Sequence, residues 1–431
     1  MTAKHIAESL QTSVAGRYDV IVGGAGPAGV AAALAAARTG ASVLLIEANG
    51  CLGGIWTAGL LCWVIDADRP GIIQTIRQQL EAAGARGQKR FSERHWTYDP
   101  EIMKRLLEQM CMDANISIRL HTRIVAVAKQ QDQRTLRAVL TESRSGREAW
   151  EAKQFIDCTG DGELACRAGC AFAVGHPTTG DVQPASMTML ITGVRFSEIE
   201  PFVGGGLREP KIRLAQEIRD AGWDPSYRTP VIFPIYDDLF AFVPNHQYDV
   251  HPGNADLLTK ATIEARAECH AIVNALRQRG GCWQDLRIVA TTEHLGMREG
   301  RRIQGLYTVM YEDLLSGARQ EDAICRVTMN VDVHNAKRTD HRLSSKNRKP
   351  IQPYDIPLRS LIARDADNLW LAGRCISGDF LAHSSYRVTG NAVGMGEAAG
   401  VSAALAARKH IQAAHLDYAH VHAALEPIRG S

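Results

Sequence analysis

The pattern of apolar and polar positions predicts a strand, a helix and a second strand near the start of the chain. Residues 18–22 form a short apolar run rich in β-branched side chains, which is typical of a buried parallel strand. Residues 28–38 are dominated by alanine and predict a helix, and residues 42–46 predict the next strand. Ahead of them, residues 1–16 predict a frayed lead-in or a short helix. The order of these elements favours a parallel βαβ unit.

Helical and strand-like periodicities continue after this unit. Residues 72–81 and 100–112 have the spacing of amphipathic helices, and residues 116–127 contain two strand-like runs. The polar segment at residues 130–151 is typical of a hairpin or a small meander. We therefore expect helices and strands to alternate through the first third of the chain.

The pattern of apolar and polar residues changes at about Cys170. Strand-like and helical runs follow one another at residues 186–194, 212–221, 231–233, 239–243, 262–279 and 287–292. They predict an inserted sheet with helices. The end of the chain again has the pattern of the first part. A strand enters a glycine turn at residues 368–374, and a helix follows at residues 392–409. That helix contains so many small residues that we expect it to lie flush against a strand or a cofactor.

Gly24, Gly26 and Gly29 have the G-x-G-x-x-G spacing between the first strand and the first helix. The first glycine allows a tight turn, the second lets the backbone approach a pyrophosphate, and the third lets the helix pack close to the strand. The helix N-terminus offers free N–H groups to the phosphates. Glu47 ends the second strand, where a carboxylate can accept hydrogen bonds from an adenosine ribose and repels a 2′-phosphate. The unit predicts a bound dinucleotide, FAD or NAD rather than NADP.

Composition narrows the classes of function. The chain has 431 residues, of which 45% are hydrophobic and 22% charged, so it is long enough for two ordinary globular domains. A formal net charge of +2 gives no basic surface for nucleic acid. The ten cysteines lack C-x-x-C pairs, which argues against a zinc site or a redox dithiol and favours reduced thiols in a cytoplasm. We expect no metal, no signal peptide and no membrane helix.

Three segments carry a resemblance to a known family: GGAGPAG with the following glutamate and GCLGG, then DCTGDGELACRAG, then DNLWLAGRCIS with AHSSYRVTGNAVGMGEAAG. Together they resemble FAD-dependent oxidoreductases of the glutathione-reductase-like superfamily, over residues 17–410. The segments GMREGRRIQG and YDIPLRSLI are similar to a poorly characterised bacterial group of such proteins. The resemblance implies FAD, and contacts between FAD and Gly24, Gly26, Gly29, Glu47, Gly53, Gly54, Thr159, Gly160, Gly373, Arg374 and Asn391. At the position of Arg374, many relatives have an aspartate that contacts the ribityl hydroxyls of FAD.

The resemblance implies an α/β fold, with a Rossmann-type FAD-binding domain built on a parallel sheet and an inserted α+β substrate domain. We expect a discontinuous FAD-binding domain at residues 17–170 and 346–410. The substrate or cap domain then spans residues 171–345, and residues 411–431 form a C-terminal helix and tail.

Residues 155–162 predict a strand that runs into a glycine turn. They resemble the segment at which the chain of glutathione-reductase-type flavoproteins returns past FAD. The competing match is the Asp-Gly segment of flavin monooxygenases. Arg167 is one residue too close to Asp161 and Gly162 for that pattern, which favours the first interpretation.

Three residues are candidates for catalysis. His383 lies between the last strand and the last long helix, where it would take or give a proton, or merely pack the loop. Arg298 and Arg301 could clamp a substrate carboxylate, although a solvated charged face or an ion pair with Glu299 is an alternative. Cys375 is either a site that attaches or modulates the flavin or a small buried thiol.

These features predict an FAD-dependent dehydrogenase or reductase that carries out two-electron chemistry on a small polar organic molecule, with a carboxylate as one option. An FAD-dependent monooxygenase that uses NAD(P)H and O₂ is the first alternative, and a non-catalytic flavin-binding protein is the second. No second G-x-G-x-x-G follows a strand, so electrons would come from the substrate, a partner protein or transiently docked NAD(P)H. We expect no nucleic-acid partner, and a homodimer stays open.

Overall fold

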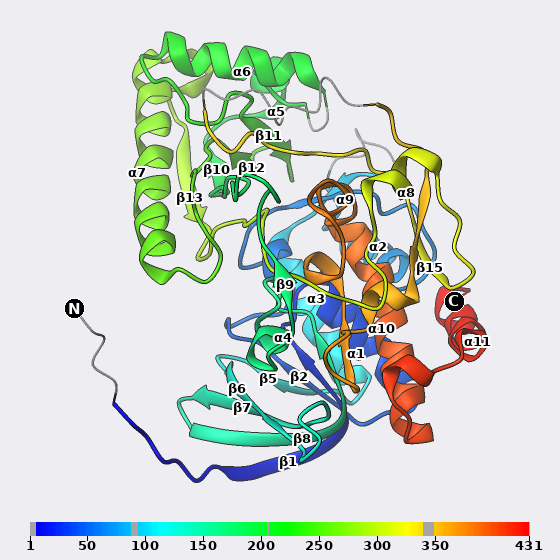
Figure 1. The fold of residues 1–431 in the computed structure, drawn as a ribbon. Coiled ribbons are helices and arrows are strands. Elements are labelled where there is room, and N and C mark those ends of the chain that lie inside the picture. Colours follow the sequence, from blue (N-terminus) through cyan, green and yellow to red (C-terminus); the bar gives the residue numbers. More distant parts are fainter. Residues whose placement is uncertain (1–5, 88–93, 205–206, 339–348, 431) are drawn as a thin grey trace.

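The computed structural model describes residues 6–87, 94–204, 207–338 and 349–430 (Figure 1). Its largest sheet has the strand order β5-β2-β1-β8-β7-β6, and β17 also pairs with β8. The strands are β1 (Ser13–Gly23), β2 (Val43–Ile46), β5 (Ser117–Arg119), β6 (Arg123–Lys129), β7 (Leu136–Ser143), β8 (Gly146–Asp157) and β17 (Leu369–Leu371). Neighbouring strands pair in parallel from β5 to β8 and β17, whereas β8, β7 and β6 pair antiparallel.

The predicted βαβ unit consists of β1, α1 (Pro27–Arg38) and β2. β2 and the last residues of β1 are buried, as expected for central strands covered on both faces. The predicted α/β fold with a Rossmann-type domain is therefore confirmed. The expected lead-in is wrong for residues 13–16, because β1 already starts at Ser13. Ser13 and Val14 pair with the long β8, whose hairpin with β7 extends the sheet and offers them backbone partners.

The two amphipathic helices predicted after the first unit are α2 (Ile72–Ala82) and α3 (Pro100–Asp113). α2 buries its isoleucines and Leu80 along one face, in agreement with the sequence pattern. α3 begins at a proline, and the side chain of Asp99 accepts hydrogen bonds from the backbone N–H groups of Glu101 and Ile102. Local sequence thus determines where this helix starts.

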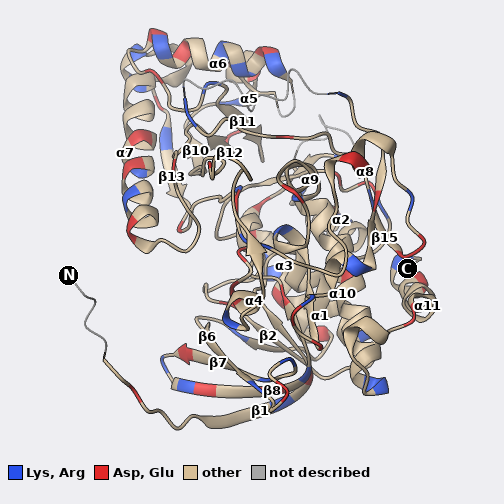
Figure 2. Ribbon diagram, viewed as in Figure 1, with Lys and Arg blue, Asp and Glu red and all other residues tan. Residues whose placement is uncertain are grey.

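The helix rich in small residues is α10 (Thr389–Lys409), and it packs against α1. A Cβ atom at Gly396 would lie 2.2 Å from the carbonyl oxygen of Ala28, and one at Gly400 would lie 2.2 Å from that of Ala32. At these two glycines the partner is therefore a helix, α1, while α10 also packs against β8 and β1. Figure 2 shows α10 almost free of charged residues until its end, which agrees with its burial.

A second sheet has the antiparallel order β11-β12-β10-β13. Its elements are β10 (Met189–Thr192), β11 (Val231–Pro234), β12 (Phe240–Val243) and β13 (Arg287–Thr291), with α5 (Phe196–Ile199), α6 (Arg208–Asp220) and α7 (Ala255–Arg279). One face of this sheet and the helices form a second core, whereas Leu190, Val231, Phe233, Ala241 and Val243 on the other face belong to the larger core around the first sheet. Figure 1 shows α6 and α7 on the outer side of this sheet. The domain division stays a prediction, and its boundary at residues 345 and 346 lies outside the described residues.

The remaining helices and strands are mostly short. They are β3 (Trp63–Val64), β4 (Trp96–Thr97), α4 (Glu163–Arg167), β9 (Phe172–Ala173), β14 (Arg302–Ile303), α8 (Tyr311–Ser316), β15 (Ala323–Val327), β16 (Tyr354–Pro357), α9 (Phe380–Tyr386) and α11 (Tyr418–Arg429). α11 supplies the expected C-terminal helix. No helix within the described ranges is long and apolar enough to cross a membrane.

Candidate functional site

The first glycine loop joins β1 to α1 and has little room for side chains. Gly24 has φ +87°, and a Cβ atom there would lie 2.7 Å from the carbonyl oxygen of Cys158. A Cβ atom at Gly29 would lie 1.8 Å from the carbonyl oxygen of Gly24. At Gly26, which precedes α1, a Cβ atom would meet nothing within 4 Å. The loop is therefore tight on the side of the protein and open at Gly26, beside the free N–H groups of the helix.

Glu47 is held beside this loop. Glu47 is 6% exposed, and its carboxylate accepts hydrogen bonds from the backbone N–H of Ala25 at 2.7 Å and of Asn49 at 2.9 Å. These bonds fix the carboxylate at the end of β2, next to the start of α1. This is where a ribose of a dinucleotide lies when its phosphates occupy the glycine loop.

The second glycine loop packs on the first. The backbone N–H of Gly53 donates to the carbonyl oxygen of Ala25 at 2.7 Å, and Gly53 has φ +103°. A Cβ atom at Gly54 would lie 3.0 Å from the Cα atom of Gly26. The structure thus places Gly53 and Gly54 directly beside Ala25 and Gly26 of the first loop.

The turn with Thr159 and Gly160 follows β8. Fully buried Asp157 accepts hydrogen bonds from the backbone N–H of Thr159 at 3.0 Å and from its hydroxyl at 2.7 Å. Its other oxygen accepts from the N–H of Ala165 at 2.8 Å, and burial raises the pKa of this carboxyl group. Sequence reasoning did not single out Asp157. The signal was an acid directly after the two buried apolar residues Phe155 and Ile156 at the end of the strand.

Gly373 and Arg374 follow β17 and reach the same place. Gly373 has φ +84°, and a Cβ atom there would lie 3.1 Å from the Cβ atom of Ala28 at the start of α1. Arg374 donates to the carbonyl oxygens of Gly160 at 3.1 Å and Met297 at 2.6 Å, and to the Oδ1 atom of Asp161 at 2.6 Å. Its guanidinium therefore ties three segments together, and a contact with FAD stays a prediction for this residue.

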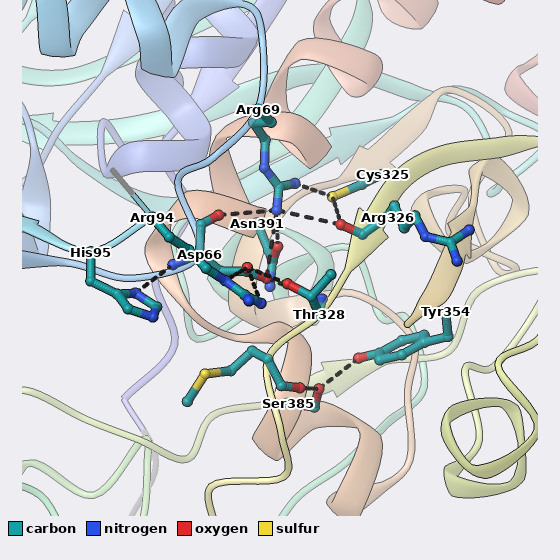
Figure 3. Close-up of polar contacts among 11 residues, drawn as sticks. Asp66, Arg69, Arg94, His95, Cys325, Arg326, Thr328, Tyr354, Ser385 and Asn391 are labelled. Atoms are coloured by element: carbon teal, nitrogen blue, oxygen red, sulfur yellow. Dashed lines mark hydrogen bonds and ion pairs between the residues drawn. The ribbon is translucent and has the colours of Figure 1, made fainter. Parts of the chain in front are cut away.

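Asn391 lies in the first turn of α10 and is fully buried (Figure 3). Its Oδ1 atom accepts a hydrogen bond from Arg69, whose Nη1 atom also lies 2.5 Å from the Sγ atom of Cys325. Arg69 in turn forms an ion pair with Asp66 at 3.6 Å. The Nδ2 atom of Asn391 has no hydrogen-bond partner among the described residues. An unpaired buried donor at a helix N-terminus fits a polar ligand, and sequence reasoning missed Arg69, which orients this amide.

His383 lies in α9, just before α10, and its side chain is 0% exposed. Neither ring nitrogen has a hydrogen-bond partner among the described residues. Burial, followed by the charges of Arg302 and Arg387, lowers its pKa well below the ordinary value of 6.5. The ring is therefore neutral at pH 7 and has two unused polar atoms, which suits both proton transfer and contact with a ligand. Its catalytic role stays a prediction.

The two arginines expected to clamp a substrate have different partners. Arg298 donates from Nη1 to the carbonyl oxygen of Pro184 and to the hydroxyl of Ser186, both at 2.8 Å. Arg301 donates to the carbonyl oxygen of Asp161 at 3.0 Å and to Glu163 at 3.1 Å. The segment around them is neither a long helix nor a long strand, since only Arg302 and Ile303 form a strand. The clamp stays a prediction.

Glu299, expected as an alternative partner of these arginines, binds Arg302 instead. Cys375 is fully buried, and its Sγ atom lies 3.4 Å from the carbonyl oxygen of Asp157. Burial raises the pKa of this thiol, so it stays protonated. The ten cysteines are all free. Among the described residues, no group of three histidines, cysteines or acids could hold a metal ion.

The structure therefore gathers the predicted cofactor residues around the start of α1. The first glycine loop and the start of α1 lie beside Glu47, Gly53, Gly54 and Gly373. Asn391 lies at the start of α10, and His383 lies just before it. Open space at Gly26 fits a pyrophosphate, and unpaired polar atoms on Asn391 and His383 fit a polar ring system. The residues present thus fit a dinucleotide with an extended polar ring.

Comparisons with known proteins agree with this geometry. The sequence matches a family model described as FAD dependent oxidoreductase over residues 19–425. Thiamine thiazole synthase from Aeropyrum pernix is 46% identical over 66 residues, a match that covers 15% of this chain and 24% of that protein. This chain therefore matches only about a quarter of the length of that relative.

Solved structures resemble the whole chain weakly. A geranylgeranyl bacteriochlorophyll reductase-like protein from Thermoplasma acidophilum has 12% identity and a TM-score of 0.43, covering 96% of this chain and 83% of that one. The p-nitrophenol 4-monooxygenase from Pseudomonas putida has 9% identity and a TM-score of 0.48, covering 96% and 90%. Because these TM-scores lie below 0.5, the assignment rests on the family model: the chain belongs to the FAD-dependent oxidoreductase family, and its cofactor is FAD.

Proposed function

We propose that the protein is a dehydrogenase or reductase that oxidises or reduces a small polar organic molecule by two-electron chemistry with FAD. The observation that carries the proposal is His383, a neutral and fully buried base in α9, just before α10. Neither of its ring nitrogens has a hydrogen-bond partner in the part of the chain that the structure describes. A proton acceptor beside the flavin site is what the removal of a hydride and a proton from a substrate requires. The proposal includes membership of the glutathione-reductase-like superfamily.

The residues that hold FAD follow from the contacts around α1. The loop at Gly26 and the helix N-terminus receive the pyrophosphate, and Glu47 accepts from a ribose. Asn391, oriented by Arg69, offers its amide N–H at the positive end of the dipole of α10. When bound, FAD supplies a ring that accepts or gives a hydride.

The remaining predicted residues act on the substrate. His383 takes or gives the proton at one of its ring nitrogens, and Arg298 orients an anionic group through the part of its guanidinium not used by Pro184 and Ser186. Arg301 is the second cation that we propose to orient the substrate, and it does so while it binds Asp161 and Glu163. Electrons leave or reach the flavin through the substrate, a partner protein or transiently docked NAD(P)H.

Anaerobic reduction of the flavin tests this function. The holoprotein is mixed with a panel of small alcohols, amines and carboxylic acids, and the loss of flavin absorbance is followed by stopped flow. We expect at least one class of compound to bleach the flavin in the absence of oxygen and nicotinamide. If the protein works as a reductase, an oxidised substrate should instead restore the absorbance of the reduced flavin. Oxidation of NAD(P)H that depends on both O₂ and substrate would identify a monooxygenase instead. A flavin that no substrate, nicotinamide or chemical reductant reduces would indicate a binding protein.

A further inference from the structure

A cluster of aromatic, imidazole and guanidinium groups lies between the second core and the start of α10. The rings of Tyr227 and His246 are stacked with centroids 3.8 Å apart, and His246 lies 5.0 Å from His334. Arg298 and Arg387 are close enough to this group to affect the pKa of His334, which burial and then Arg298 lower to about 4. These residues come from five separate segments, so only the tertiary structure assembles them.

Arg387, between α9 and α10, is largely buried in this cluster, with 9% of its side chain exposed. Its Nη2 atom donates to the carbonyl oxygen of Asp332 at 2.7 Å and to the side chain of Gln183 at 3.2 Å, and Nη1 donates to the carbonyl oxygen of Arg298 at 3.3 Å. Its Nε atom is buried with no hydrogen-bond partner among the described residues. Burial lowers the pKa of this guanidinium to about 10.

Among the described residues, a single carboxylate forms ion pairs with the positive charges of this cluster. Asp332 is the acid that pairs with it, 3.8 Å from Arg387 and 3.2 Å from His334, and half of its side chain is exposed. Glu299, the next acid in this region, is already paired with Arg302. Two guanidiniums, on Arg298 and Arg387, thus share one half-exposed carboxylate. Buried charges without counter-charges are strongly destabilising, so this arrangement favours an anionic ligand.

An unpaired histidine points to the same ligand. His246 is 5% exposed, and its Nε2 atom has no hydrogen-bond partner among the described residues. Burial, followed by the charge of Arg298, lowers its pKa well below 6.5, so the ring is neutral and can donate one hydrogen bond. A neutral donor beside two guanidiniums is suited to a carboxylate, which accepts several hydrogen bonds at once.

We propose that Arg298 and Arg387 bind the carboxylate of an organic acid, with His246 as an additional hydrogen-bond donor. This inference rests on the proposed function, and it specifies the small polar substrate as a carboxylic acid. Arg387 follows His383 by one helical turn, and its backbone N–H donates to the carbonyl oxygen of His383 at 3.1 Å. A carboxylate held by Arg387 would therefore lie on the same side of α9 as the proposed base.

Titration calorimetry on the FAD-loaded protein tests the site without requiring turnover. The probes are acetate, benzoate and succinate, each compared with its uncharged amide. We expect at least one acid to bind more tightly than its amide. Arg298→Met and Arg387→Met should each weaken its binding roughly ten- to a hundredfold, because each removes a charge-assisted hydrogen bond. Arg387→Lys, which keeps the charge but loses the planar fork, should lie between these values.

Two further variants separate binding from damage to the fold. Arg213→Met removes an exposed arginine of α6 that pairs with Glu209, and it should bind the acid as the parental protein does. Asp332→Asn removes the internal counter-charge and should tighten binding several-fold, which a purely structural role of the cluster would not produce. Flavin content and melting temperature are recorded for each variant.

The site is disproved if no acid binds more tightly than its amide. It is also disproved if Arg298→Met and Arg387→Met both keep parental affinity. Flavin reduction by a substrate together with either result would overturn this site and the substrate role of Arg298, and it would leave the two-electron chemistry with FAD and His383 intact. Arginine-dependent binding of an acid in a protein whose flavin is never reduced would overturn the proposed function and support the site.

Discussion

Two glycines of the first loop have opposite surroundings, although they are three residues apart. Gly26 has φ −67° and ψ −174°, a conformation open to any residue, and a Cβ atom there meets nothing within 4 Å. A Cβ atom at Gly29 would lie 1.8 Å from the carbonyl oxygen of Gly24. The first glycine thus leaves room for a ligand, and the second leaves room for the protein itself.

Replacement of Gly26 by valine should therefore remove FAD and spare the fold. The side chain would occupy the path of the pyrophosphate, whereas the flavin-free protein should lose no more than about 1 kcal/mol of stability. Flavin absorbance per chain and urea unfolding of the flavin-free protein measure the two effects. Gly29→Val is the matched control and should fail to fold. A Gly26→Val protein with full flavin content would contradict the assignment of the loop.

His383→Gln should slow flavin reduction by a substrate about 10²- to 10⁴-fold at unchanged flavin content, because it removes a general base. The base must be neutral, and the pKa of His383 lies well below 6.5. The parental rate should therefore be constant above pH 6.5 and fall as the pH drops through that lowered pKa. Stopped-flow reduction at several pH values measures this, with exposed His422→Gln as control. A parental rate in His383→Gln would make His383 a packing residue.

At the scale of elements, the contact between α1 and α10 positions both ends of the site. The two helices approach so closely that the backbone of α1 occupies the space of a side chain on α10, at Gly396 and Gly400. The glycine loop precedes α1, and Asn391 lies at the start of α10. Their spacing thus depends on how closely these two helices pack.

Gly400→Ala should destabilise the protein by about 1–3 kcal/mol or more, because its methyl group would lie 2.2 Å from the carbonyl oxygen of Ala32 and force the helices apart. Alanine is otherwise the better helix former, so propensity alone predicts stabilisation. Denaturant unfolding gives the sign. Arg408→Ala, at an exposed position of the same helix, should be neutral. Parental or increased stability of Gly400→Ala would show that the helices are not this close.

At the scale of the whole molecule, His246 and His383 are buried and His334 is 15% exposed, and all three are held without charge. Burial, followed by neighbouring arginines, lowers the pKa of His246, His334 and His383 below the ordinary value of 6.5. In the unfolded chain these rings take up protons at about pH 6.5, whereas in the folded protein they do so only at lower pH. Acid therefore favours the unfolded state through these residues.

The free energy of unfolding should accordingly fall as the pH is lowered from 7.5 to 5.5. The contribution of the three histidines is complete above pH 6.5 and is lost as the pH drops toward their lowered pKa values. Urea unfolding at several pH values measures the slope. His246→Gln should make the decline shallower, and exposed His415→Gln should leave it unchanged. Equal stability at pH 7.5 and 5.5 would contradict the burial of neutral rings.

The sequence alone was sufficient to predict the βαβ unit and the cofactor. The glycine spacing, the apolar strands and Glu47 lie within one stretch, and a tight turn between a strand and a helix is a local requirement of the backbone. Helix limits such as the start of α3 also followed from a nearby proline and aspartate. These features were predictable because the residues that cause them are neighbours in the chain.

Only the tertiary structure decided which distant residues meet. Gly396 and Gly400 of α10 pack against another helix, which a pattern of glycines does not specify. Arg301 lies with Asp161 and Glu163, whereas Arg387 lies with Arg298, and no spacing in the sequence distinguishes the two arginines. Burial of a charge or a histidine depends on the packing of several segments at once. The sequence by itself therefore determined the fold class and the cofactor, and packing decided which charged groups surround the proposed substrate.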